Sequence, residues 1–137
     1  MSDTSLKTPP STGAASGGVK LVLRLEGLAI LVAALVAYQH AGFAWSTFAW
    51  FVLLPDVSFL GYLAGPRIGA LSYNLAHSYV GPVLCLAASV WLSAPVLMCA
   101  ALIWLAHIGV DRLFGYGLKY TRGFGFTHLG RLGKTTL

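Results

Sequence analysis

Five ionisable side chains lie inside long apolar stretches of the chain, where charge is most costly to keep. They are three acids and two histidines: Glu26, Asp56, His77, His107 and Asp111. At the centre of a membrane helix a charged group such as a carboxylate costs about 2.5 to 3.5 kcal/mol on insertion scales, so it usually faces the protein interior and has a partner. We therefore expect these side chains to gather in a buried polar cluster.

Two pairs of polar residues have helical spacing. His107 and Asp111 are four residues apart, and Asn74 and His77 are three residues apart. Side chains at either spacing lie on one face of a helix, about one turn from each other. Each pair can therefore point at a common centre.

A proline directly precedes one of the acids. Pro55 lacks a backbone N–H and its ring clashes with the carbonyl four residues earlier, so we expect a kink next to Asp56. The kink frees the backbone carbonyl of Phe51, which must find a partner inside the protein because lipid offers none.

Imidazole and carboxylate groups together suit a divalent metal ion, and zinc, manganese and iron commonly take both as ligands. The predicted ligands are Asp56, His77, His107 and Asp111, with Asn74 in support. Such an ion can lower the pKa of a bound water to about 7 and supply a nucleophile. Glu26 and Asp56 are the candidate general bases.

Composition indicates a membrane protein. Of 137 residues, 57% are hydrophobic and 9% are charged, whereas soluble domains have roughly 25% charged residues. The net charge of +5 is interpreted as attraction to anionic inner-leaflet lipids, because the chain contains no nucleic-acid-binding motif. The absence of a G-x-S-x-G motif disfavours covalent serine catalysis.

Four apolar runs are long enough to cross a hydrocarbon core about 30 Å thick, which takes roughly 20 helical residues. They cover residues 21–38, 43–63, 68–92 and 95–114. The links between them are short, so neighbouring helices must run antiparallel. The sequence predicts an all-α membrane protein with four transmembrane helices in an up-down-up-down bundle.

All nine basic residues fall on one side of this predicted bundle. They lie before or at the start of the first run, in the second link, or at and beyond the end of the fourth run. Because cytoplasmic loops collect lysine and arginine, both termini are expected to be cytoplasmic. With this orientation, the polar cluster lies within roughly 13 Å of the inner face.

The remaining segments differ from the helical domain, which is predicted at residues 20–114. Residues 1–19 are rich in Ser, Thr, Gly and Pro, as in a disordered tail. Residues 115–137 alternate glycine with aromatic and basic residues, which suits an interfacial anchor. The alternative is a lid, in which Lys119, Arg122 or His128 contacts an anionic headgroup or substrate.

Several short motifs occur in a characteristic order. They are LRLEG at 23–27, LPDVS at 54–58 with GY at 61–62, YNLAH at 73–77, WLAHIGVDR at 104–112, GYGLKY at 115–120 and THLG at 127–130. Together they resemble a bacterial membrane-protein family, domain of unknown function 4260, over about residues 20–132. The resemblance implies a small multi-pass protein of the bacterial inner (plasma) membrane, and it supplies no activity.

Two classes of function follow from these patterns. As an enzyme, the protein is a metal-dependent hydrolase of a lipid-derived or membrane-proximal substrate. As a non-enzyme, it is a membrane bundle whose polar side chains hydrogen-bond each other, at about 0.6 kcal/mol per contact, or line a proton or solute pathway. The sequence specifies neither the substrate nor the oligomeric state.

Overall fold

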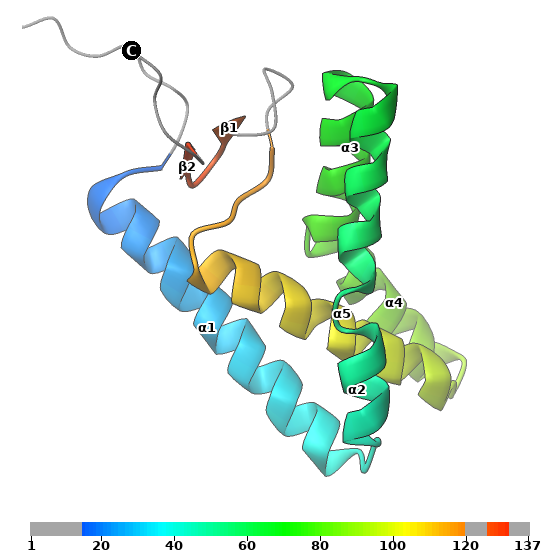
Figure 1. Ribbon diagram of the computed structural model, residues 1–137. Helices are drawn as coiled ribbons and strands as arrows, with labels where there is room; N and C mark the ends of the chain where they lie inside the picture. The colour runs from blue at the N-terminus through cyan, green and yellow to red at the C-terminus, as the bar shows by residue number, and fades with distance from the viewer. Residues whose placement is uncertain (1–14, 120–125, 132–137) are drawn as a thin grey trace, which may run out of the picture.

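The computed structural model describes residues 15–119 and 126–131, and its helices follow the apolar runs of the sequence (Figure 1). The elements are α1 (Gly17–His40), α2 (Trp45–Phe51), the 3-10 helix η1 (Leu54–Ala64), α3 (Pro66–His77), α4 (Val80–Trp91), α5 (Pro95–Leu113), β1 (Phe126–Thr127) and β2 (Gly130–Arg131). The two short strands pair antiparallel. The predicted all-helical class is confirmed for the described residues apart from this small hairpin.

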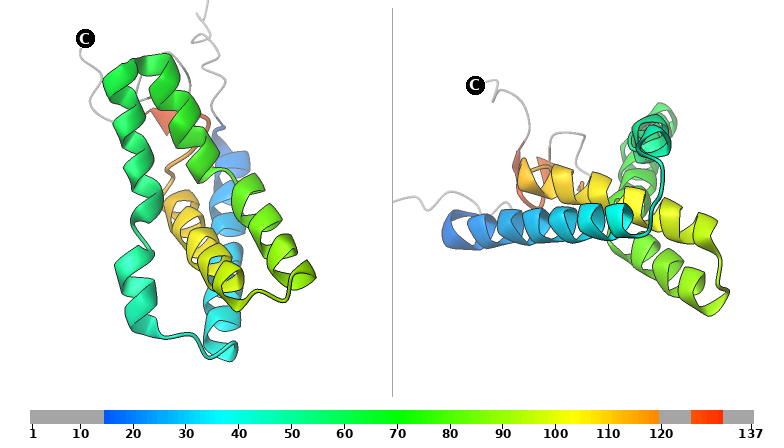
Figure 2. Two further views of the ribbon diagram at one scale, coloured as in Figure 1. Left: turned by 90° about the vertical axis from the view of Figure 1, so that its right-hand side faces the viewer. Right: turned by 90° about the horizontal axis from the view of Figure 1, so that it is seen from below.

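Three segments are long and apolar enough to cross a membrane: Gly17–His40, Trp45–Ala64 and Pro95–Leu113. A short link joins α1 to the antiparallel Trp45–Ala64 segment, and α3 and α4 then return the chain to the start of α5 (Figure 2). Large apolar side chains cover the outside of the molecule, with Trp50, Leu63 and Trp91 each more than 80% exposed. An apolar surface this extensive suits lipid rather than water.

The third predicted span is divided into two helices. α3 ends at His77, Ser78 has extended backbone (φ −89°, ψ 152°), and α4 begins at Val80. In one continuous helix, the ring of Pro82 would clash with the carbonyl of Ser78. Four spans and a cytoplasmic location of both termini therefore remain predictions. At the other end of the chain, α1 already begins at Gly17, inside the predicted tail, whose residues 1–14 lie outside the described chain.

The predicted kink before Asp56 is present as a change of helix type. α2 ends at Phe51, and the N–H of Asp56 bonds to the carbonyl of Leu53 at 3.0 Å. In an α-helix that N–H would bond to the carbonyl of Val52, four residues back. This hydrogen bond therefore leaves the carbonyl of Val52, the residue after Phe51, available to a side chain.

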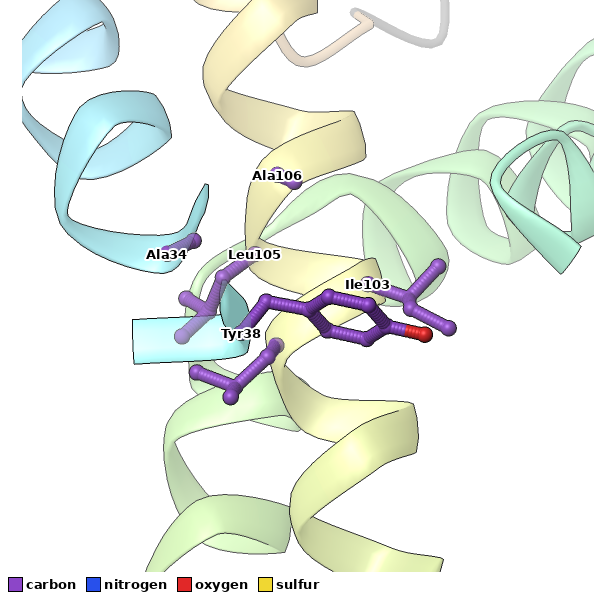
Figure 3. Close-up of a cluster of buried hydrophobic side chains, with 6 residues drawn as sticks. Ala34, Tyr38, Ile103, Leu105 and Ala106 are labelled. Carbon is purple, nitrogen blue, oxygen red and sulfur yellow. The ribbon is translucent and has the colours of Figure 1, made fainter. Parts of the chain in front are cut away.

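The core lies between α1 and α5 (Figure 3). Ala34 and Tyr38 of α1 pack against Ile103, Leu105 and Ala106 of α5, and the Tyr38 side chain is completely buried. The Tyr38 hydroxyl donates to the backbone carbonyl of Ala44, just before α2, at 2.7 Å. The packing of these side chains fixes α5 against α1. It leaves other faces of α5 for α4 and the η1–α3 hairpin.

Candidate metal centre

Four of the residues predicted as ligands meet in one place. Asp56 comes from η1, His77 is the last residue of α3, and His107 and Asp111 come from α5. One ligand atom from each lies within 4.8 Å of all the others. We call these four residues the His/Asp group.

The two imidazole nitrogens lie at similar distances from the other ligand atoms of the His/Asp group. Nε2 of His77 lies 3.2 Å from Oδ1 of Asp56 and 3.4 Å from Oδ2 of Asp111, and Nε2 of His107 has the same two distances. The two Nε2 atoms are 3.1 Å apart. All four ligand atoms lie within 4.8 Å of one another, a spacing at which they can share one metal ion.

The outer nitrogens of both histidines face backbone carbonyls. Nδ1 of His77 is 3.0 Å from the carbonyl oxygen of Tyr73, and Nδ1 of His107 is 2.6 Å from that of Val52. A carbonyl oxygen only accepts hydrogen bonds, so each Nδ1 carries a proton and donates it. In a neutral ring the Nε2 atom then presents a lone pair. Metal-binding histidines in proteins are oriented by such bonds.

The group therefore consists of acceptors that face one another. With neutral rings, two Nε2 lone pairs and two carboxylate oxygens converge on one point, and none of these four atoms carries a proton. Such an arrangement is stable only with positive charge among the four atoms. That charge is either a metal ion or protons added to the rings.

The helix ending at His77 is fixed by side chains of α5. The guanidinium of Arg112 donates to the carbonyl of His77 at 2.7 Å, and the indole N–H of Trp104 donates to the carbonyl of Ala76 at 2.6 Å. The last carbonyls of a helix have no partner within it, so these two bonds cap α3. The ring of Tyr73 stacks on that of His77, with centroids 3.8 Å apart.

Tyr73, Trp104 and Arg112 were not predicted as site residues from the sequence. A signal exists for Tyr73, which precedes His77 by four residues and so shares its helical face. No local pattern marks the other two as caps, because their partners on α3 are 28 and 35 residues away along the chain.

The four side chains of the His/Asp group differ in how far they are exposed. The side chains of His77 and His107 are 0% and 5% exposed, whereas those of Asp111 and Asp56 are 19% and 39% exposed. The imidazole pair is therefore enclosed by protein. Asp56 forms the side of the group that a small molecule can reach.

One predicted general base, Glu26, and the predicted supporting residue Asn74 lie apart from this group. Glu26 is exposed on α1 and is not among the residues whose ligand atoms converge. Asn74 holds the backbone of Lys119: its amide donates to the carbonyl at 2.8 Å and accepts from the N–H at 2.7 Å. Asn74 therefore fixes the segment that follows α5.

The predicted headgroup contacts also have structural partners. Lys119 is buried, and its Nζ lies 4.8 Å from the centre of the Tyr73 ring, a cation–π distance. Nδ1 of His128 accepts the N–H of Leu118 at 2.8 Å. Burial lowers the pKa of Lys119 and that of His128. Arg122 lies outside the described residues, and contact of any of these side chains with lipid or substrate stays a prediction.

Comparison with known proteins gives a family and no activity. No curated protein and no solved structure matches the chain. A family model described as a domain of unknown function, DUF4260, matches residues 20–132. The matched region includes the whole His/Asp group and the three segments apolar enough to cross a membrane, apart from the first residues of α1. The chain therefore belongs to the DUF4260 family.

Proposed function

We propose that the His/Asp group binds a divalent metal ion, and that the protein is a metal-dependent hydrolase of a membrane-associated substrate. The observation that carries the proposal is the pair of Nε2 atoms 3.1 Å apart, on two rings that both donate Nδ1–H to carbonyls. A cation between them satisfies both lone pairs at once.

Charge balance supports a metal ion over protons. Two carboxylates carry two negative charges, so a divalent ion makes the group neutral, which lowers the cost of holding it among membrane segments. Two protonated rings also give neutrality, but they bring two positive charges to 3.1 Å. A single proton can bridge the two Nε2 atoms, but it leaves the group with one uncompensated negative charge. The alternative of a purely hydrogen-bonded bundle is therefore less well supported.

The unequal exposure of the four residues suggests different roles. Catalytic zinc sites commonly keep three protein ligands and one position for water. We assign His77, His107 and Asp111 as the ligands, because they are the most enclosed. Asp56, whose Oδ1 lies 3.2 Å from both Nε2 atoms, is assigned as the base that accepts a proton from water. The ion supplies the lowered pKa of that water.

The proposed setting is the bacterial inner membrane, with four spans and both termini in the cytoplasm. It is supported by three apolar segments and by the bias of basic residues to one side of the predicted bundle. A topology reporter fused after Gly130 should read cytoplasmic. A periplasmic signal from that fusion contradicts this orientation.

Elemental analysis of the detergent-purified chain tests the metal. We expect a stoichiometric ion in the wild type and its loss in His77→Ala and His107→Ala. Asp56→Asn should retain the ion and lose hydrolysis. Matched controls are His40→Ala and Glu26→Gln, since both residues are exposed on α1. A metal-free wild type whose thermal stability does not change on adding zinc or manganese overturns the proposal.

A further inference from the structure

An apolar pocket of ≈ 680 Å³ lies between the second membrane segment and α5. This volume is within the range of small-molecule sites, about 300 to 1,000 Å³. Its walls contain no charged residue, and they include Phe51, Leu54, Pro55, Ala76, Ala100 and Trp104. The pocket therefore suits a hydrocarbon ligand.

The pocket and the His/Asp group share one face of α5. Val96, Ala100 and Ile103 line the pocket, and continuing along α5 in steps of four residues leads to His107 and Asp111. Residues at such spacing form one stripe on a helix. The pocket thus leads along α5 toward two residues of the group.

The other two members of the group are also adjacent to the pocket wall. Pro55 lines the pocket and directly precedes Asp56, and Ala76 lines it and directly precedes His77. Along α5 the lining extends from residue 95 to residue 104, which is about 14 Å at the helical rise. An elongated ligand in the pocket would therefore have one end beside the His/Asp group.

We infer that the pocket holds the single acyl chain of a membrane amphiphile and presents its ester carbonyl to the His/Asp group. This inference rests on the proposed function and names its substrate class. The lining comes mostly from segments apolar enough to cross a membrane, so the ligand enters from lipid. A helix with its side chains is about 10 Å wide, whereas an acyl chain is narrow enough to follow one stripe of α5.

The reaction on such a substrate balances without a further reactant. The water oxygen forms a bond to the acyl carbon, and the bond between that carbon and the alcohol oxygen breaks. Asp56 accepts one proton from the water and passes it to the departing alkoxide. The products are a fatty acid and an alcohol, and Asp56 returns to its ionised form.

Photocrosslinking of the full chain in lipid nanodiscs tests the inference. One fatty ester carries a diazirine near the end of its acyl chain, and a second carries it beside the ester carbonyl. We expect the first probe to label residues 96–100 and the second to label residues 54–58, with both competed by the unmodified ester. Peptide mass spectrometry locates the labels.

Variants that fill the pocket provide the control. Ala100→Trp and, independently, Val96→Trp should reduce labelling roughly tenfold, corresponding to about 1.4 kcal/mol of binding. Val32→Trp is the matched control, because Val32 is exposed on α1 and does not line the pocket. Label spread evenly over outward-facing residues, and unchanged by both pocket variants, overturns the inference.

Metal analysis of the same samples separates this inference from the proposed function. Stoichiometric metal with unlocalised probe leaves the metal site in place and rejects the acyl pocket. Localised, competed labelling in a metal-free protein rejects the hydrolase and retains the acyl pocket.

Discussion

The imidazole of His77 lies flat against the phenol ring of Tyr73, with centroids 3.8 Å apart and planes 9° from parallel. The backbone carbonyl of the same tyrosine accepts the Nδ1–H of His77. One residue therefore fixes both the plane and the tautomer of this ring. His77 is completely buried, so its Nε2 direction is set before any ligand arrives.

Removing the stacked ring should weaken metal binding without removing a ligand. We expect Tyr73→Ala to reduce metal affinity roughly 10- to 100-fold, as for other residues that orient a ligand. Tyr73→Phe keeps the ring and should keep the affinity. Competition with a chromogenic chelator measures both, and equal affinities for the two variants contradict a role for the stack.

Replacing Pro55 with alanine should weaken the hydrogen bond that orients His107. In Pro55→Ala, regular α-helix can continue from α2, and the N–H of Asp56 can then bond to Val52 instead of Leu53. The Val52 carbonyl now accepts Nδ1–H of His107 at 2.6 Å. We expect metal affinity to fall roughly tenfold, at the low end of such effects.

Pro66 offers a matched proline control for this experiment. It is the first residue of α3, a position at which a backbone N–H has no acceptor within the helix. Pro66→Ala should therefore leave the metal affinity unchanged. If Pro55→Ala binds metal as the wild type does, the helix break has another cause.

The close contact of α1 with α5 should tolerate no added methyl group. A Cβ at Gly109 would lie 2.8 Å from the carbonyl oxygen of Gly27 and 2.9 Å from the backbone nitrogen of Leu31. Backbone atoms cannot move aside cheaply, so we expect Gly109→Ala to lower the free energy of unfolding by about 1–3 kcal/mol. Denaturant titration in detergent measures the loss.

Gly18 provides the comparison for Gly109. A Cβ there meets nothing within 4 Å, and the residue lies in α1. Gly18→Ala should therefore not lower the free energy of unfolding, because alanine is preferred to glycine in a helix. A loss of equal size in both variants argues against a specific α1–α5 contact.

The four residues of the His/Asp group could be predicted from the sequence. Their signals are helical spacing within one apolar run and a similar predicted depth in the membrane. His107 and Asp111 have i, i+4 spacing within one apolar run, and Asp56 and His77 lie at a similar depth in their own runs. Glu26 satisfied the same depth argument but faces outward. Its neighbour Gly27 packs against α5, and successive residues of a helix point about 100° apart.

The supporting contacts could not be predicted because they join residues far apart in sequence. Asn74 and Lys119 are 45 residues apart, and their pairing follows from how α3 meets the segment after α5. The 3-10 form of η1 was also missed. Pro55 indicated a break, but the hydrogen bond from Asp56 to Leu53 also frees the carbonyl of residue 52, which the predicted kink did not include.

Acidification should loosen the attachment of the C-terminal hairpin through His128. Its Nδ1 accepts the Leu118 N–H, so a proton on that nitrogen removes the acceptor. Burial and then the nearby charge of Arg112 lower the pKa of His128 from 6.5. As pH falls through about 6.5, the detached ring binds a proton before the attached ring does, so the attachment weakens with falling pH.

Hydrogen exchange at the Leu118 amide measures this local effect. We expect its protection factor to be constant above about pH 7 and to decrease below about pH 6, where a free histidine is mostly charged. His128→Gln cannot titrate and should show no such decrease, whereas His40→Gln should behave as the wild type. Because the reporter is the amide that bonds to His128, protonation of His77 or His107 cannot produce the same pattern across these variants. A protection factor that stays constant through this range in the wild type contradicts the attachment.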